Sequence, residues 1–402
     1  MHVCVATNLH PPLDDRIYYK EILSLQKRFE PITLLAPDCP VPEGTLPESV
    51  RYVPLKSRRR RFGRIRSILE IVRLVAKYRP DVVHFHDFDL ALAVPMLRAV
   101  SRAKLVYDVH EAYPEAVLIS SIPVPHLLRR PLSWCVDRLE KTMAHWCELI
   151  VTADEPTAAA FARTGKPVIV VFNYPAKSLF QTAVVSDALR ERYSGRKVIV
   201  YHGSMSADRG LFHMIRAMPA LRRADPAITL LLIGLRKDGL RHVAEREIRQ
   251  LGVATNVEVI PWLEYTSIPS WLRVASLGLV PLQPTEKYMR NIPIKVFEYM
   301  ACGLPVLGAD LPPIARYIEE SGAGRVYDST SVESLAANVL DMLANEAELA
   351  RMSRNGLRAV RERWSWERME ARLFEAYDEL DAQIRQLRTG SGRGQARSVP
   401  SR

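Results

Sequence analysis

Residues 201–210 (YHGSMSADRG) have the residue types of a phosphate-binding turn. They complete the apolar, β-branched run Lys197–His202 and lead into a helix-like stretch that begins at Leu211. A glycine such as Gly203 lets backbone N–H groups approach a phosphate, and the N-terminus of a helix attracts an anion. Arg209 would add a permanently charged, forked donor for a diphosphate. The pattern is neither GxGxxG nor a P-loop, so an ordinary strand–turn–helix connection is the alternative.

A second segment, residues 291–306 (NIPIKVFEYMACGLPV), could bind a nucleoside. Lys295 and Glu298 stand three positions apart and would share one face of a short helix. A carboxylate can accept hydrogen bonds from two ribose hydroxyls at once, and the start of the helix would favour a phosphate. The alternative is a solvent-exposed ion pair between the two side chains.

Histidines and acids follow two apolar runs in the first half of the chain. His110 lies in residues 107–111 (YDVHE), and an imidazole can donate to or accept from a hydroxyl near neutral pH. A structural histidine is the alternative. Residues 84–89 (HFHDFD) contain Asp87 and Asp89 in a D-x-D spacing that some metal sites use, but an isolated D-x-D is common.

The segment 7–17 (TNLHPPLDDRI) joins the first apolar run to the first helix pattern. Asp15 and Arg16 could contact a substrate, or they could stabilise the start of the helix, where an acidic residue is favourable. The sequence favours neither interpretation over the other.

Strand patterns and helix patterns alternate through both halves of the chain. Such alternation is typical of parallel sheets that are covered on both faces. It pauses in the polar stretch 173–186 and then restarts, which predicts two doubly wound halves whose ligands bind at the carboxyl ends of the strands. The predicted strands are His2–Thr7, Pro31–Ala36, Asp81–Phe85, Lys104–Val109, Glu148–Thr152 and Pro167–Phe172, then Lys197–His202, Thr229–Ile233, Val257–Ile260, Leu277–Val280, Pro305–Leu307 and Arg325–Tyr327.

The composition indicates a globular chain. Its 402 residues suggest two or three domains, and 48% of them are hydrophobic. No apolar stretch approaches the ~20 residues of a spanning helix, and the N-terminus has no basic region typical of a signal peptide. Five cysteines without metal-type spacing predict reduced thiols in a cytoplasmic protein.

The formal net charge of +11 is concentrated in two segments. Residues 51–79 hold eleven Lys or Arg and one acid, Glu70, and residues 385–402 hold five Arg and no acid. Localised charge favours an anionic partner, and a solvated surface is the alternative. Residues 56–66 precede an apolar-faced helix, which suits peripheral contact with an anionic membrane. No motif typical of nucleic-acid binding accompanies the charge, so we expect no nucleic-acid partner.

The second segment resembles the donor-site signature of retaining GT-B glycosyltransferases of the glycosyltransferase family 4 type. That signature has two glutamates eight positions apart, the second followed by (Y/A)MA-x-G-x-PV. Glu298 and residues 299–306 (YMACGLPV) match its second half. The first glutamate would fall at position 290, where this sequence has Arg290, a departure that resembles a family branch with the form N-x-P-x-K-x-F-E-Y-M-A. A basic residue usual after the first glycine of the turn is replaced by Ser204.

The resemblance spans nearly the whole chain and implies a role for each candidate residue. Catalytic roles fall to three residues, since Arg209 would contact the donor diphosphate, Glu298 would hold the ribose and His110 would approach the donor sugar. The residues implied at the donor site are Gly203, Arg209, Ile294, Lys295 and Glu298. The residues implied on the acceptor side are Asp15, Arg16 and Glu111.

The implied fold is α/β and of the GT-B type. Two Rossmann-like doubly wound domains would face each other across a cleft, and a C-terminal helix would return to the N-terminal domain. The expected parts are an acceptor domain over 1–180, a donor domain over 190–365, the terminal helix over 366–388 and a disordered basic tail over 389–402.

The implied reaction moves a sugar from a nucleotide-sugar to a glycan or a polyprenyl-linked lipid, with retention of configuration and without a metal or other cofactor. The setting would be polysaccharide or glycolipid biosynthesis at the inner face of the plasma membrane. A sugar-nucleotide epimerase of the same fold is one alternative. A catalytically silent nucleotide-sugar-binding protein is another, and Arg290 keeps it open.

Overall fold

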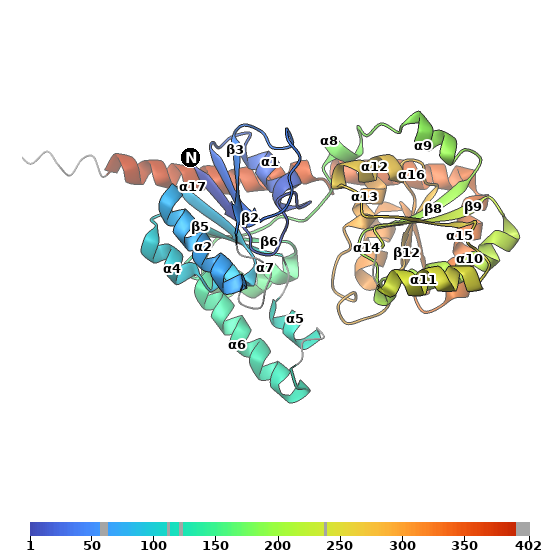
Figure 1. The fold of residues 1–402 in the computed structure, drawn as a ribbon, viewed down its shortest axis with the longest axis horizontal. Helices are drawn as coiled ribbons and strands as arrows, with labels where there is room; N and C mark the ends of the chain where they lie inside the picture. The colour runs from blue at the N-terminus through green and yellow to red at the C-terminus, as the bar shows by residue number, and fades with distance from the viewer. Residues whose placement is uncertain (57–62, 111–112, 120–123, 237–238, 391–402) are drawn as a thin grey trace, which may run out of the picture. The chain divides into compact units, whose positions relative to one another are not determined.

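Figure 1 shows a computed structural model of the chain, which describes residues 1–56, 63–110, 113–119, 124–236 and 239–390. The chain forms two compact units. We call Met1–Asn173 with Arg368–Arg402 the N-terminal domain, and Tyr174–Glu367 the C-terminal domain. Each is built around one parallel sheet, so the predicted α/β, doubly wound architecture is confirmed. Among the described residues, no helix combines the length and apolar character needed to cross a bilayer.

The N-terminal sheet has seven strands in the order β3-β2-β1-β4-β5-β6-β7. Its strand order reverses direction between β1 and β4, which is where a doubly wound sheet usually binds a ligand. The strands are β1 Val3–Ala6, β2 Ile32–Pro37, β3 Val50–Leu55, β4 Val82–His86, β5 Lys104–Val109, β6 Leu149–Thr152 and β7 Val168–Val170.

The edge strand β3 is absent from the strands predicted above. Its sequence VRYVPL contains Arg51 and Pro54, and it is only partly buried. Pro is tolerated on edge strands because an edge leaves one row of N–H groups unpaired. The sequence therefore lacked the continuous apolar run that identified the central strands.

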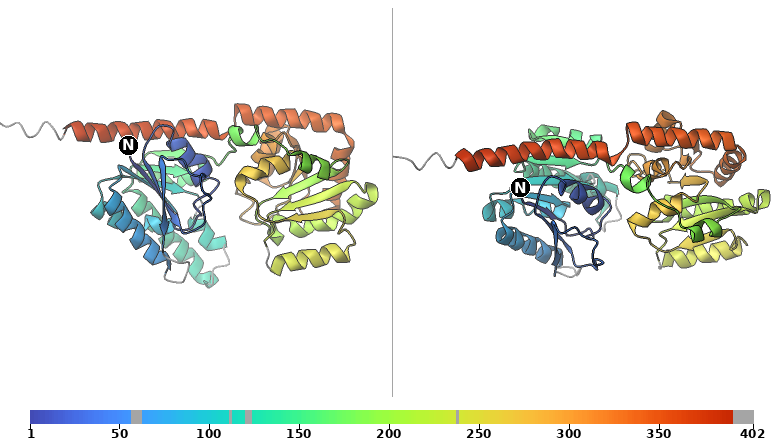
Figure 2. Two further views of the ribbon diagram at one scale, coloured as in Figure 1. Left: turned by 45° about the horizontal axis from the view of Figure 1, so that its top comes forward. Right: turned by 90° about the horizontal axis from the view of Figure 1, so that it is seen from above.

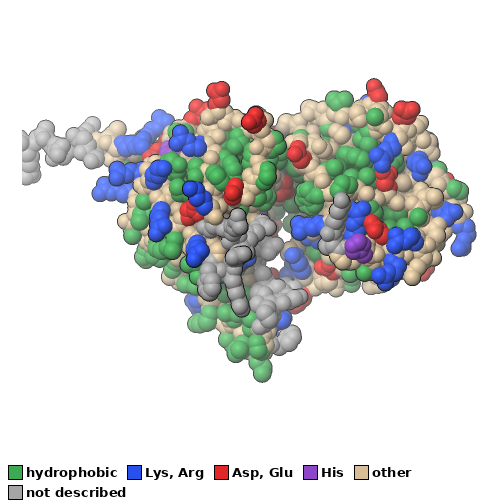
Figure 3. Space-filling view, in the orientation of Figure 1, with side chains coloured by type: hydrophobic (Ala, Val, Ile, Leu, Met, Phe, Trp, Pro, Cys, Tyr) green, Lys and Arg blue, Asp and Glu red, His purple; other side chains and the backbone are tan. Residues whose placement is uncertain are grey.

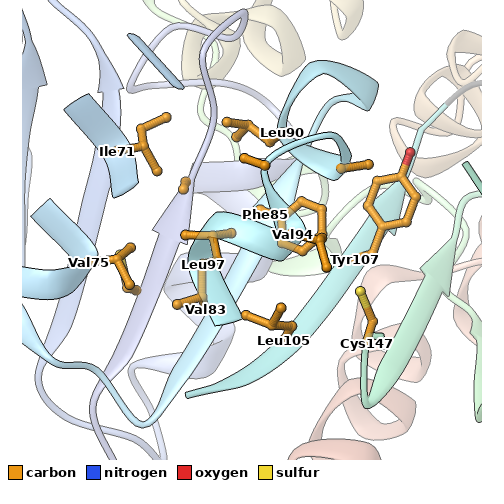
Figure 4. Packing of buried hydrophobic residues seen from close by; sticks show 14 of the residues in the cluster. Ile71, Val75, Val83, Phe85, Leu90, Val94, Leu97, Leu105, Tyr107 and Cys147 are labelled. Atoms are coloured by element: carbon orange, nitrogen blue, oxygen red, sulfur yellow. The ribbon is translucent and has the colours of Figure 1, made fainter. Parts of the chain in front are cut away.

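The two faces of the N-terminal sheet carry different side chains. Val83 and Phe85 of β4, with Leu105 and Tyr107 of β5, pack into an apolar core beneath α2 and α4 (Figure 4). Side chains alternate along a strand, so the residues between them point to the other face of the sheet. On β4 these intervening residues include two histidines, and on β5 they include an aspartate. The helical elements of this domain are η1 Ile17–Ile22 (a π-helix), α1 Leu23–Leu25, α2 Gly63–Tyr78, α3 Phe88–Ala91, α4 Val94–Val100, α5 Tyr113–Ile119, α6 His126–Ala144, α7 Glu155–Phe161 and η2 Ala162–Thr164.

The C-terminal sheet has six strands in the order β10-β9-β8-β11-β12-β13, with the reversal between β8 and β11. The strands are β8 Lys197–His202, β9 Ile228–Ile233, β10 Val257–Ile260, β11 Leu277–Val280, β12 Val306–Ala309 and β13 Gly324–Tyr327. The helical elements are α8 Lys177–Phe180, α9 Asp187–Arg192, η3 Ala207–Arg209, α10 Leu211–Ala224, α11 Gly239–Gln250, η4 Tyr265–Ser267, α12 Ile268–Leu272, α13 Lys295–Ala301, α14 Pro312–Ser321, α15 Val332–Ala344 and α16 Glu346–Glu362.

The last helix, α17 (Trp366–Gly390), packs along the N-terminal domain from Arg368 onward (Figure 2). Tyr377 is fully buried there, and its hydroxyl lies 2.6 Å from His84 Nδ1. Arg28 stacks on Phe374, with 4.1 Å from the guanidinium carbon to the ring centroid. The end of the chain thus closes the face of the N-terminal sheet that carries the histidines.

Candidate functional site

The carboxyl end of β8 forms a tight turn in the C-terminal domain. Gly203 has a φ of +103°, and its N–H donates to Ile233 O at 2.9 Å. Gly234 follows β9 with the same φ, and a Cβ added there would lie 2.8 Å from Gly203 O. The two strand ends therefore approach so closely that only glycine fits at position 234.

Helix α13 brings Lys295 and Glu298 to this turn. Its apolar side chains are buried, and the hydroxyl of Tyr299 donates to backbone carbonyls of β8 and β11 at 3.3 and 3.2 Å. Glu298 Oε2 lies 3.2 Å from His202 Nε2, and Lys295 Nζ lies 4.8 Å from the centroid of the Tyr201 ring. Both charged side chains are buried, unlike the solvent-exposed ion pair that was the alternative.

Arg209 reaches the same turn from the other side. Its Nη1 donates to Ser204 O at 3.3 Å, and its Nε donates to the Tyr288 hydroxyl at 3.1 Å. Both acceptors are neutral oxygens, so these contacts position the guanidinium without neutralising its charge. Gly210, which follows, has a φ of +78°, and a Cβ there would lie 2.0 Å from Pro281 O. The Arg209–Gly210 pair is thus fixed by backbone packing.

The remaining donor-side residues lie before α13. Ile294 is half-buried at the N-cap position, with no side-chain hydrogen bond there. Arg290, which stands where the family resemblance expects a first glutamate, is exposed. The structure therefore gathers Gly203, Arg209, Lys295 and Glu298 around residues 201–204.

In the N-terminal domain, His110 follows β5 and is largely buried. Its Nε2 lies 2.9 Å from His86 Nδ1 and 3.4 Å from Asp108 Oδ1. Burial lowers the pKa of His110 to about 4, despite the raising effect of Asp108. The imidazole is therefore neutral near pH 7, as a group that exchanges hydrogen bonds with hydroxyls needs to be.

The acceptor-side candidates differ in how far they are buried. Arg16 is buried, and its Nη1 donates to Val171 O at 2.7 Å. Asp15 is half-buried in the loop before η1. Asp14, which the sequence did not single out, accepts hydrogen bonds from the backbone N–H groups of Arg16 and Ile17 at 2.9 and 3.0 Å and so starts the helix. Glu111 lies outside the described residues.

The two carboxylates of the D-x-D spacing have different partners. Asp87 accepts from the Thr7 hydroxyl at 2.7 Å and lies 3.3 Å from His10 Nε2. Asp89 lies 3.6 Å from Arg64. Each carboxylate is thus directed at a different partner.

A buried polar cluster beside His110 was missed by sequence reasoning. It contains Arg16, Glu21, His84, His86 and Asp108, each at most 3% exposed. Arg16 Nη2 donates to both oxygens of Asp108 at 3.2 and 3.1 Å, and Arg16 Nε lies 2.8 Å from Glu21 Oε1. His84 and His86 stand at alternate positions of a buried strand, which indicates that β4 has a polar face. No local pattern identifies Glu21.

Two family models match the chain, one in each domain. Residues 22–174 match the family described as Glycosyltransferase Family 4, and residues 187–359 match Glycosyl transferases group 1. The two matches together leave only the ends of the chain and the connection between the domains outside them.

Curated relatives are similar at low identity. A GDP-mannose-dependent alpha-(1-6)-phosphatidylinositol monomannoside mannosyltransferase from Mycolicibacterium smegmatis is 27% identical over 46% of this chain and 50% of its own length. A GDP-mannose:cellobiosyl-diphosphopolyprenol alpha-mannosyltransferase from Xanthomonas oryzae pv. oryzae is 22% identical over 77% of this chain and 76% of its own. The chain spans about half the length of the first curated relatives it matches.

Solved structures share the fold over almost the whole chain. Sucrose-phosphate synthase from Thermosynechococcus elongatus has a TM-score of 0.75 at 15% identity and covers 95% of this chain and 99% of its own. Anabaena HepE, solved with UDP-glucose, has a TM-score of 0.71 at 15% identity, covering 94% of this chain and 100% of its own. The chain therefore has the GT-B fold, and its N-terminal and C-terminal domains match Glycosyltransferase Family 4 and Glycosyl transferases group 1, respectively.

Proposed function

We propose that this protein is a glycosyltransferase that moves a sugar from a nucleotide-sugar to a glycan or lipid-linked acceptor with retention of configuration. The observation that carries the proposal is the arrangement at the end of β8. There, a buried carboxylate and a guanidinium held by neutral oxygens converge on one glycine turn. A nucleotide-sugar needs these same groups, because its ribose hydroxyls donate and its diphosphate is anionic.

In this proposal Glu298 accepts the ribose hydroxyls, and Arg209 contacts the diphosphate. Lys295 supplies a second positive charge next to Gly203, since a Cβ at that glycine would lie 4.0 Å from Lys295 Nζ. Ile294 contributes its backbone N–H. The leaving diphosphate gains negative charge as the glycosidic bond breaks, so Arg209 and Lys295 stabilise the transition state electrostatically and no metal is required.

The N-terminal domain supplies His110 to the donor sugar and the surface for the acceptor. His110 is neutral, and its Nε2 is engaged with His86 and Asp108, which fixes the orientation of the ring. Asp15 and Glu111 are the remaining acceptor-side candidates. Arg16 acts through the buried cluster, because its guanidinium is directed inward.

A lipid-linked acceptor is supported by helix α6, whose end shows hydrophobic side chains at the bottom of Figure 3. Leu127, Leu128 and Trp134 are 91%, 56% and 61% exposed on it. Arg130 and Arg138 of the same helix are also exposed. Exposed apolar side chains beside arginines suit peripheral contact with an anionic membrane at its cytoplasmic face. Of the basic segment 56–66, residues 57–62 lie outside the described part of the chain.

GDP-mannose is the first donor to test, because two of the relatives above are named for it. The test is a thermal-shift comparison of GDP-mannose, UDP-glucose, GDP and UDP, followed by NMR of the bound donor with and without polyprenyl-diphosphate glycans. A donor that stabilises the protein and passes its sugar with retention to an acceptor supports the proposal. An isomerised sugar released without acceptor would indicate an epimerase, and tight binding without turnover would indicate a silent binding protein.

A further inference from the structure

Four potential metal ligands meet inside the N-terminal domain, on the face of the sheet opposite the apolar core. They are Glu21 of η1, His84 and His86 of β4, and Asp108 of β5, and each is at most 1% exposed. One ligand atom from each lies within 4.8 Å of the others. This cluster is separate from the proposed donor site, which belongs to the C-terminal domain.

Three distances within the cluster exceed the usual length of a hydrogen bond. His84 Nε2 lies 3.4 Å from Asp108 Oδ2 and 4.0 Å from Glu21 Oε2, while His86 Nε2 lies 3.5 Å from Glu21 Oε2. An N–H···O bond would need about 2.7–3.2 Å. Within the described part of the chain, neither Nε2 atom nor Glu21 Oε2 has a hydrogen-bond partner. Buried polar atoms without partners are costly, so three of them facing one point require an explanation.

A metal ion accounts for this spacing. Zn²⁺ binds imidazole nitrogens and carboxylate oxygens at about 2.0–2.2 Å, and ligands at the corners of such a tetrahedron are about 3.3–3.6 Å apart. Of the six separations among four ligand atoms, two of the three given above fall within that range and the third exceeds it by a few tenths of an ångström, while all six are at most 4.8 Å. Two imidazoles with two carboxylates also form a donor set that Zn²⁺ accepts.

The outer nitrogen of each histidine is already engaged. His84 Nδ1 lies 2.6 Å from the Tyr377 hydroxyl, and His86 Nδ1 lies 2.9 Å from His110 Nε2. When Nδ1 carries the proton and donates outward, the lone pair of Nε2 points into the cluster, as it does in a metal-bound histidine.

The carboxylates face the same point with one oxygen each. Arg16 Nε lies beside Glu21 Oε1, and Arg16 Nη2 contacts Asp108, so the guanidinium serves as an outer partner of both acids. Glu21 reaches this position because η1 is a π-helix, in which its N–H donates to Arg16 O at 3.0 Å. A π-helical turn is frequent at functional sites, and here it places two charged side chains five positions apart on one side.

We propose that Glu21, His84, His86 and Asp108 bind one Zn²⁺ ion as a structural site closed to solvent. All four ligands come from the protein, so no coordination position is left for a substrate, and the ion takes no part in sugar transfer. It joins η1 to β4 and β5 and holds the His86 ring that contacts His110. The site stands independently of the proposed glycosyl transfer.

The test measures metal directly on the full chain with any affinity tag removed. Protein expressed with added ZnCl₂ and dialysed should retain about one equivalent of zinc by elemental analysis, as a closed four-ligand site implies. His84→Gln and His86→Gln should lose it, and His145→Gln, which changes an exposed histidine elsewhere in the domain, should keep it. Chelator-treated wild type should regain a higher melting temperature with ZnCl₂.

A second experiment needs no variant and so does not depend on whether the variants fold. CoCl₂ is added to chelator-treated wild type, because Co²⁺ bound tetrahedrally by protein ligands absorbs visible light. Zinc retention with those absorption bands supports the site. Wild type without zinc, without bands and without a melting shift overturns it, and the cluster is then a proton-linked polar network. Equal zinc in wild type and both His→Gln variants also overturns it, since the ion then binds elsewhere. Binding of GDP-mannose is a separate measurement, so either proposal can fail alone.

Discussion

The two domains each carry an arginine at the carboxyl end of the sheet, near the point where the strand order reverses, and the two arginines have opposite surroundings. Arg16 is 3% exposed and lies against two carboxylates, those of Glu21 and Asp108. Arg209 is half-buried and is held by the Tyr288 hydroxyl and the Ser204 carbonyl, which are both neutral. The same place in the two sheets therefore differs between the domains. In the N-terminal domain the charge of Arg16 is used in internal ion pairs, and we call this the closed position. In the C-terminal domain the charge of Arg209 stays available for a ligand, and we call this the open position.

The largest effect is expected from Arg16→Ala, which tests the closed position. Removing the guanidinium leaves Asp108, which is 0% exposed, without its cation. Leaving one member of a buried pair uncompensated typically costs about 3–5 kcal/mol in the free energy of unfolding. Urea unfolding in the presence of EDTA measures this loss without a contribution from a bound ion.

Arg28→Ala is the matched control for Arg16. Arg28 pairs with Asp378 at 2.5 Å, but the two side chains are 48% and 52% exposed. An exposed pair contributes about 0–1 kcal/mol, and the stacking of Arg28 on Phe374 at a partly exposed site adds about 0.5–1 kcal/mol. This variant should therefore lose much less stability than Arg16→Ala. Similar losses in both variants would contradict the contrast between buried and open arginines.

Glu140 shows what happens to a buried carboxylate that lacks such a guanidinium. It is 2% exposed and accepts from the Tyr107 hydroxyl at 2.7 Å. Burial raises its pKa from 4.5 to about 7, with Asp137 raising it further and Tyr107 and Lys141 opposing the shift. Asp108 behaves oppositely, because Arg16 outweighs the effect of burial and holds its pKa well below the usual range.

Glu140→Gln should therefore stabilise the protein at high pH. Below pH 4.5 the carboxyl is protonated in both states and contributes nothing. Between pH 4.5 and about 7 the unfolded chain releases the proton while the folded chain retains it, so wild type loses stability as pH rises. The variant lacks this loss and should be more stable by about 3 kcal/mol at pH 8. Urea unfolding of both proteins at pH 4 and pH 8 measures it, and a difference that does not grow with pH would contradict the shifted pKa.

The open position is tested by Arg209→Ala. One positioned cation at a leaving diphosphate is worth about 2–4 kcal/mol, so kcat/KM for sugar transfer should fall about 10²-fold. The stability of the variant should change little, because Arg209 forms no buried ion pair among the described contacts. Arg216→Ala, which breaks an exposed pair with Glu247 on α10, is the control and should keep full activity. Near-normal turnover of Arg209→Ala would remove this residue from the donor site.

A site can be predicted from the sequence when its residues lie close together in the chain. Strand β8 was predicted with its observed bounds, and Gly203 and Arg209 follow within seven positions. Such a site is readable because a strand and its following turn place its residues locally. Lys295 and Glu298 were also singled out by their spacing, and the family resemblance assigned both to the donor site. The structure brings them to the same turn.

The closed position was not predictable, because its residues stand far apart in the sequence. Its contacts join η1, β4, β5 and α17, up to 293 positions apart for His84 and Tyr377. The pattern predicted a helix after Arg16 but not its π-helical form, which is what brings Glu21 beside Arg16. Alternation along β4 shows that two histidines share a face, yet which residues meet them follows only from the packing of the whole domain.

The smallest effect is expected from Tyr288→Phe. This variant tests whether the Tyr288 hydroxyl only positions Arg209 or also contacts the donor. The change removes the hydroxyl that accepts from Arg209 Nε at 3.1 Å and that also contacts Asp208, and it leaves the charge of Arg209 intact. A single hydrogen bond of this kind contributes about 0.5–1.5 kcal/mol, so the donor should bind about 2–10-fold more weakly by calorimetry. Tyr193→Phe, whose hydroxyl donates to Glu258 at 2.9 Å in the same domain, should leave donor binding unchanged. If Tyr288→Phe lowers the affinity for the donor as much as Arg209→Ala does, the Tyr288 hydroxyl itself contacts the donor. Two groups, and not the charge of Arg209 alone, would then bind the donor at the open position.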